Sequence, residues 1–155
     1  MKSYTFSLLI ALAALSFVRP VHPTAFHSYI SFKGSKQGQL KGSSTKGGRE
    51  DKGWFLIQGF ELQGEVPVDA NKPGTTGKRT HKPIIITKEE DGASPQLLNA
   101  HSTNEVFDNI VIQTIDDQNK VTKTITLTNA VISDLRKNGA IETLSFNYEK
   151  IEAKQ

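Results

Sequence analysis

Apolar and polar residues alternate over 26–33, the first patterned segment after the amino-terminal stretch. Phe26, Ile30 and Phe32 fall on one face of an extended chain, together with Ser28. A two-residue period of this kind predicts a strand with one face in the core.

Two further strands are predicted before the middle of the chain. Residues 54–62 read WFLIQGFEL and are apolar on both faces at the start, so this strand is expected to be central or at an interface. Residues 82–89 follow, with Pro83 at a position that suits the start of a strand or an edge. Long connections at 34–53 and 63–80 separate the strands, and connections of this length are usually functional or mobile.

A short helix is predicted after the third strand. Ser94 is a natural N-cap, and Pro95 suits the first helical position. The helix is expected to run to about Asn104, with Leu97 and His101 among the residues spaced three or four apart. A helix of this length is marginal alone in water, so its apolar stripe must pack against the strands.

The remainder of the chain is expected to be strand. Strands are predicted at 106–115, 120–134 and 141–152. A change of the inward face near Asn129-Ala130 predicts a bulge or a bend, and Asn138-Gly139 predicts a hairpin. About six or seven strands and one short helix predict an all-β protein, a barrel or sandwich with an inserted helix.

The amino-terminal segment has a composition of its own. Lys2 lies in a short first region, Ser7–Val18 are uncharged, and Arg19-Pro20 ends the run. This is the pattern of a secretory signal peptide, and the run is too short for a permanent transmembrane helix. The sequence therefore predicts a signal peptide at 1–25, one β-barrel domain at 26–155, and a secreted or periplasmic mature protein without a membrane span.

Charge and cysteine usage exclude several classes of protein. The 155 residues fit one domain, and the absence of cysteine excludes disulfide scaffolds, cysteine-ligated metal sites and thiol nucleophiles. Within the formal charge of +3, the first 49 residues carry seven basic and no acidic side chains, and the rest carries 12 basic and 16 acidic ones. The amino-terminal region is basic and the rest of the chain is mildly acidic. Because a nucleic-acid-binding protein usually has a continuous basic surface, no nucleic-acid partner is expected.

Catalytic and metal-binding patterns are weak. The four histidines lack ligand spacing, and neither a G-x-S-x-G elbow nor a phosphate loop occurs. The acidic runs at 89–91 and 116–119 are interpreted as a solvated strand end and a turn. His81 lies in the basic run 78–82, which indicates an anion or partner surface rather than a general base. We therefore expect no catalytic residue, no cofactor and no metal.

Basic residues also lie among glycines and serines between the first two strands. They are Lys33, Lys36, Lys41, Lys46 and Arg49. No aromatic residue lies between Phe32 and Trp54, so stacking on single-stranded nucleic acid is not supported. The segment is interpreted either as a soluble loop or as a surface that docks on an acidic face of a partner or of another copy.

The order of sequence motifs resembles one family. A first strand ending in glycine leads into SKQGQLKGSSTKGGRE, Trp54 opens a strand, and GKRTHKPIIITKEEDGASPQLLNA, NEVFDNIVI, TITLTNAVISDL and ETLSFNYEKIE follow. Over residues 27–153 the chain resembles the haemolysin-coregulated protein (Hcp) family, the tube protein of type VI secretion. The most specific pieces are the run at 88–98 and the LTNA-V-I-S run.

The resemblance implies a β-barrel of two packed antiparallel sheets with a flanking helix. It also implies a hexameric ring with a wide hole, rings stacked into a tube, effectors in the lumen, and spike and sheath components as partners. It implies no catalytic residues, and it assigns subunit contacts to the loop at 63–80. The candidate assembly residues are Trp54, which is an interface or core anchor, together with Val66, Lys78, Arg79 and His81.

Two functions from different classes stay open on the sequence alone. The first is a structural tube protein, or an exported homologue of one. The second is a secreted monomeric β-barrel binding module that uses the loops at 34–53 and 63–80. The signal-like segment is the departure from the family, whose members begin near the first strand, and it favours an exported homologue within the first class.

Overall fold

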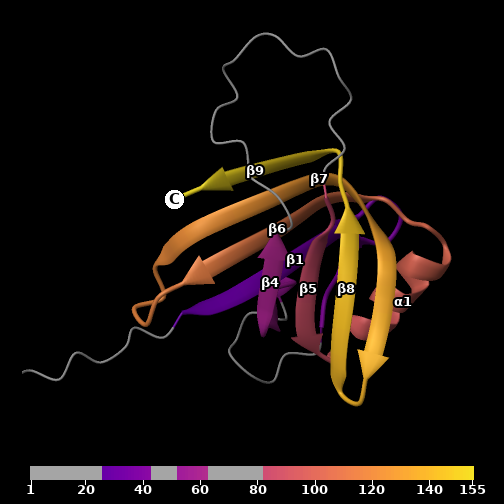
Figure 1. Cartoon of the computed structure of the whole chain (residues 1–155), viewed down its shortest axis with the longest axis horizontal. Coiled ribbons are helices and arrows are strands. Elements are labelled where there is room, and N and C mark those ends of the chain that lie inside the picture. Colours follow the sequence, from indigo (N-terminus) through magenta and orange to yellow (C-terminus); the bar gives the residue numbers. More distant parts are fainter. Residues whose placement is uncertain (1–25, 43–51, 63–81) are drawn as a thin grey trace, which may run out of the picture.

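Antiparallel strand pairing organises the residues that the computed structural model describes, 26–42, 52–62 and 82–155 (Figure 1). The elements are β1 (His27–Gly34), β2 (Gly38–Gln39), β3 (Phe55–Ile57), β4 (Gly59–Leu62), β5 (Ile84–Glu89), α1 (Ser94–Ser102), β6 (Phe107–Ile115), β7 (Val121–Asn138), β8 (Ile141–Asn147) and β9 (Lys150–Lys154). This element content confirms the predicted all-β class with one short helix.

The strands form two sheets that share β7. In sheet A, β1 pairs with β6, β6 with β7 and β7 with β9, while β2 and β3 both pair with β1. In sheet B, β4 pairs with β5, β5 with β8 and β8 with the second half of β7. Figure 1 shows the strands of sheet A running at a clear angle to those of sheet B. The two packed antiparallel sheets expected from the sequence are therefore present.

A bend in β7 at Asn129 marks the passage from one sheet to the other. Asn129 has a φ of 50°, and the pairing with β6 passes from Thr128 to Ala130 across it. Left-handed backbone suits asparagine better than most residues. The Asn129 side chain donates a hydrogen bond to the Glu149 carboxylate at 2.7 Å, at the break between β8 and β9. The pairing steps by two residues on each strand, from Asn109 to Phe107 and from Thr128 to Ala130, so no extra residue is inserted at Asn129. Of the two alternatives predicted near Asn129, the structure shows the bend, and β7 shifts register against β8 between Ile132 and Asp134.

The segment 54–62 joins the sheets a second time. It was predicted as one strand, but it divides at Gln58 into β3, which pairs with β1, and β4, which pairs with β5. The Gln58 amide donates to the Thr87 carbonyl oxygen at 2.8 Å, so the bend is anchored on sheet B. Within the described residues the ladder is an open path from β2 to β4, so hydrogen bonds do not close the barrel.

The core lies between the two sheets. Phe32 packs against Phe55, Phe107 and Phe146 with ring centroids 5.8 to 6.1 Å apart. Branched aliphatic side chains from β1, β5, β6 and β7 surround this cluster. Each fully buried side chain of this size contributes about 1.5–3 kcal/mol relative to an exposed one, so the rings fix how the sheets pack.

The helix begins differently from its prediction. Ala93 is the N-cap and makes no side-chain capping bond, while Ser94 is the first helical residue. The Ser94 hydroxyl is drawn away because it donates to the Glu142 carboxylate at 2.7 Å. The helix ends at Ser102 rather than Asn104, because Asn104 has a φ of 49°. Leu97 and Ala100 are buried, as a helix packed on the strands requires.

Candidate functional site

The candidate assembly residues fall mostly outside the described part of the chain. Trp54 is half-buried directly before β3, and its assignment as an interface or core anchor stays a prediction. Val66, Lys78, Arg79 and His81 lie outside the described residues, and their assignment stays a prediction. The surfaces available for assembly must therefore be read from the sheets themselves.

The outer face of sheet A is mainly uncharged over β1, β6 and β7 and charged along β9. Cross-strand pairs place Tyr29, Gln113 and Thr124 in one row, Ser31, Val111 and Thr126 in the next, and Lys33, Asn109 and Thr128 in a third. The residues between them along each strand point inward and are buried. Lys33 is the one charged side chain among these nine residues. Strands lie about 4.8 Å apart in a sheet, so over β1, β6 and β7 this face is an even array of mainly hydroxyl and amide groups. The register of β9 continues the three rows with exposed charged residues, Lys154, Glu152 and Lys150.

Sheet A has two different free edges within the described residues. On one side β9 pairs only with β7, and on the other β3 and β2 pair only with β1. On β9 the Lys150 ammonium lies 2.6 Å from the Glu152 carboxylate, and only Ile151 packs on the core. Unpaired edges are open to strand pairing with another chain, and edge lysines moderate this tendency.

A buried lysine ties α1 to sheet B. The Lys88 side chain is fully buried, and its Nζ lies 2.9 Å from Asp91 Oδ1 and 3.1 Å from Glu142 Oε2. It also donates to the Glu89 carbonyl oxygen at 2.7 Å and approaches Ser94 Oγ at 3.4 Å. Four oxygens thus surround one ammonium group. The cluster fixes the 89–94 connection, and hence the start of α1, against β5 and β8.

A buried glutamate fixes the connection between β1 and β2. Glu105 Oε1 accepts hydrogen bonds from the backbone amides of Lys36 and Gln37, both at 2.8 Å, and Oε2 accepts one from the Gln37 side chain at 2.8 Å. Burial on its own would raise the pKa of Glu105, but these bonds together with the charge of Lys36 lower it below its usual range. A side chain at Gly34 would overlap Glu105 Oε1, so glycine is required there.

The two ends of the lysine-rich connection meet at one point. Gln39 Nε2 lies 3.4 Å from the Gly53 carbonyl oxygen, and Gly53 has a φ of 78°. On the other side, Gln96 on α1 donates to the Lys41 carbonyl oxygen at 2.8 Å. The described residues on either side of 43–51 are therefore held together and fastened to the helix.

Three further features of the described residues concern metal binding, membrane-spanning helices and buried charges. No group of three histidine or acidic side chains able to hold a metal ion occurs in the described ranges. None of the helices in this part of the chain is long and apolar enough to cross a membrane. The sequence interpretation missed Lys88 and Glu142 as a buried pair. A signal was available, since Lys88 continues the inward positions of Ile84 and Ile86.

Comparison with known proteins gives one family. The family model described as "Type VI secretion system effector, Hcp" matches residues 29–155 of this chain. This range contains all the described strands except the first residues of β1. The match therefore concerns the whole folded region and not a single motif.

Relatives with the same fold come from several bacteria. The "Major exported protein" of Pseudomonas aeruginosa is 36% identical over 95 residues, which are 56% of this chain and 54% of that protein. The match thus spans about half the length of this curated relative. The secreted protein Hcp3 of Pseudomonas aeruginosa is 26% identical, with a TM-score of 0.64 over 84% of this chain and 98% of that one. The Hcp1 protein of E. coli EAEC 042 shares the fold at 22% identity and a TM-score of 0.64, over 83% and 97%.

Proposed function

Because the chain belongs to the Hcp family of type VI secretion system effectors, we propose that its copies assemble into hexameric rings that stack into a tube. The observation that carries this proposal is the pair of unlike free edges on sheet A, β9 on one side and β2 with β3 on the other. A contact between unlike surfaces repeats from copy to copy, and it closes into a ring when the rotation between copies allows.

The outer face of sheet A is proposed to line the channel of the ring. Its nine paired residues carry a single charge, and most of them are threonine, serine, asparagine or glutamine. Interfaces between subunits are rich in aromatic and apolar side chains, and this face has few of them, with Tyr29, Val111 and Leu56 of β3 as the members in these rows. A mainly polar, wetted wall, with both charge signs along β9, suits the passage of effector proteins.

The role is structural, and the protein acts outside the cytosol. The clusters around Lys88 and Glu105 have their polar atoms engaged within the fold, so they support packing rather than catalysis. The signal-like residues 1–25 support export in a processed form. Spike and sheath components are the further partners that a type VI tube would have.

The direct test is the assembly state of the purified protein. Light scattering after size-exclusion chromatography at about 100 µM should give six times the monomer mass, and negative-stain images should show rings. A monomer at that concentration, with no rings in the images, would instead favour the binding module that uses the loops at 34–53 and 63–80. Mass spectrometry of the mature amino terminus would test the signal peptide separately.

A further inference from the structure

Four exposed lysines gather at one corner of sheet A, which we call the lysine corner. It consists of Lys33, Lys36, Lys41 and Lys52. Lys33 pairs with Gln39 across β1 and β2, so it lies at the β2 border of the face that is proposed to line the channel, and Lys36 lies in the turn between these strands. Lys41 and Lys52 lie at the two chain ends that meet near Gln39 and Gly53. None of the four forms an ion pair within the described residues.

The lysine corner is held in place by hydrogen bonds that do not engage its ammonium groups within the described residues. The Glu105 carboxylate accepts the backbone amides of Lys36 and Gln37 and forms no ion pair with a lysine ammonium there, although the charge of Lys36 acts on it at longer range. Gln96 Nε2 binds the Lys41 carbonyl oxygen from α1. Four cations are thus presented to solvent on an ordered backbone.

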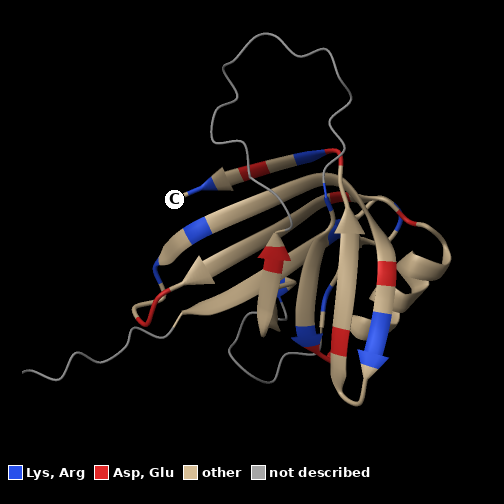
Figure 2. Ribbon diagram, in the orientation of Figure 1, with Lys and Arg blue, Asp and Glu red and all other residues tan. Residues whose placement is uncertain are grey.

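The remainder of the described chain has the opposite charge. Outside the lysine corner it carries eight basic and twelve acidic side chains, a net formal charge of −4. On the outer face of sheet B, Glu61 of β4 and Glu89 at the end of β5 are exposed and form no ion pair among the described residues. Arg136 on the same face is paired with Asp134 at 2.7 Å, so it does not neutralise them. Figure 2 shows acidic positions on β4 and near the end of β5.

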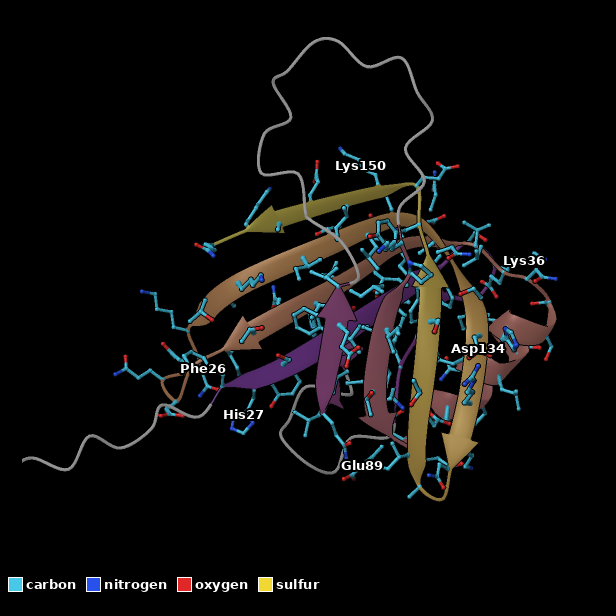
Figure 3. The ribbon with its side chains drawn as sticks, viewed as in Figure 1. Phe26, His27, Lys36, Glu89, Asp134 and Lys150 are labelled. Atoms are coloured by element: carbon cyan, nitrogen blue, oxygen red, sulfur yellow. The ribbon has the colours of Figure 1, made fainter. Side chains whose placement is uncertain are left out.

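We propose that the lysine corner of one copy docks on the Glu61–Glu89 face of the next copy. This inference rests on the proposed ring and names the charged contact between its subunits. Figure 3 places Lys36 beside α1 and Glu89 at the other end of sheet B, so the two surfaces lie apart on one chain. A contact between separate, complementary surfaces is heterologous and leaves both surfaces of every copy occupied in a closed ring.

Charge complementarity between two copies mainly fixes how they align and raises the rate at which they associate. A single exposed ion pair contributes little to affinity, so the apolar and backbone contacts of the ring must provide most of it. Like charges brought together at an interface repel each other, which is why a charge reversal is a stronger test than a deletion. Assembly should also weaken with salt, because the Debye length falls from about 10 Å at 0.1 M to about 3 Å at 1 M.

A charge swap between the two surfaces tests the docking. The variants are Lys36→Glu with Lys41→Glu, and Glu61→Lys with Glu89→Lys, with Lys120→Glu and Lys123→Glu at the β6–β7 end of sheet A as a matched control away from β2, β3 and β9. Each swap alone should raise the concentration for half-assembly at least about tenfold, and an equimolar mixture of the two swaps should restore association. The control should assemble like the wild type, and all variants should keep the wild-type circular dichroism spectrum.

The outcomes separate this inference from the ring itself. If the wild type forms rings and both swaps assemble at unchanged concentration, the docking is wrong while the ring stands. If the lysine swap weakens assembly and the glutamate swap does not, the lysine corner meets another anionic surface and the inference is overturned. If the wild type is monomeric, the docking is tested by sedimentation velocity on the mixture of the two swap variants. Association in the mixture supports the docking, and a mixture that stays monomeric contradicts it.

Discussion

The ammonium of Lys88 lies 3.1 Å from the carboxylate of Glu142 across the boundary between β5 and β8, with side-chain exposures of 0% and 6%. The two residues are directly opposite in the strand register. Ser94 at the start of α1 donates to the same carboxylate oxygen at 2.7 Å. The pair therefore joins two strands and the helix at one buried point. Three of the residues in this cluster, Lys88, Asp91 and Ser94, belong to the run at 88–98 that carries the family resemblance.

Replacing Lys88 by methionine should destabilise the fold by about 3–5 kcal/mol, because Glu142 and Asp91 would lose their buried cation. Urea unfolding of the variant and the wild type measures this difference. The double variant Lys88→Met with Glu142→Leu removes both charges and should recover part of the loss. A Lys88→Met variant within about 1 kcal/mol of the wild type would show that the cluster does not hold the helix in place.

The sequence predicts most strands here because each has one buried face. The alternation over 26–33 and the inward positions at Ile84 and Ile86 are examples. The bend at Gln58 could not be predicted, because a bent strand keeps its alternation while it changes its hydrogen-bonding partner. The change of sheet is visible only from the pairing of β3 with β1 and of β4 with β5, and these pairings are not encoded in the segment 54–62 itself.

The site residues were harder to predict for a related reason. Ser94 has the sequence features of an N-cap, but its hydroxyl instead binds Glu142, which lies 48 positions along the chain. Glu105 similarly binds a turn 68 and 69 positions before it. Such partners are brought together by the pairing of β1 with β6 and of β5 with β8, and no local pattern of residues records them.

Replacing Gly34 by alanine should cost about 2–3 kcal/mol. The added methyl group would overlap Glu105 Oε1, and Glu105 could move aside only by giving up its bonds to Lys36 and Gln37, each worth about 1.5–3 kcal/mol for a charged acceptor. Gly59→Ala is the matched control, because no atom lies within 4 Å of a Cβ at that strand position. Equal unfolding midpoints for the two variants would contradict the proposed role of Glu105.

The free energy of unfolding should decrease at acidic pH, and protonation of Glu105 should account for part of the decrease. Its pKa is lowered in the folded protein, since the bonds from Gln37 and Lys36 outweigh the effect of burial. The unfolded state, with a pKa of about 4.3, therefore takes up the proton first, so this contribution is fully present above that pH and is lost as the pH falls through the folded value.

The variant Glu105→Gln should reveal this contribution directly. It should be about 1–3 kcal/mol less stable than the wild type at pH 7, and the gap should narrow as the pH drops below about 4.3. Urea titrations across this range measure the gap. Glu152→Gln serves as the control, because the pKa of Glu152 is also lowered, by its bond to Lys150, but the group is fully exposed. If the difference in stability between Glu105→Gln and the wild type does not change with pH, the loss comes from altered packing and not from the charge of the carboxylate.

A single introduced thiol can test which face lines the channel, since the chain contains no cysteine. Thr126 lies in the middle of sheet A, between Val111 of β6 and Glu152 of β9, and its side chain points outward. In Thr126→Cys rings, a small maleimide should react freely, and a maleimide carried on a bulky polymer should react at least about tenfold more slowly than with disassembled protein. Asn99→Cys, exposed on α1, should react equally with both reagents in both states. Full reaction of the bulky reagent at Thr126→Cys in stacked rings would place this face on the outside of the tube.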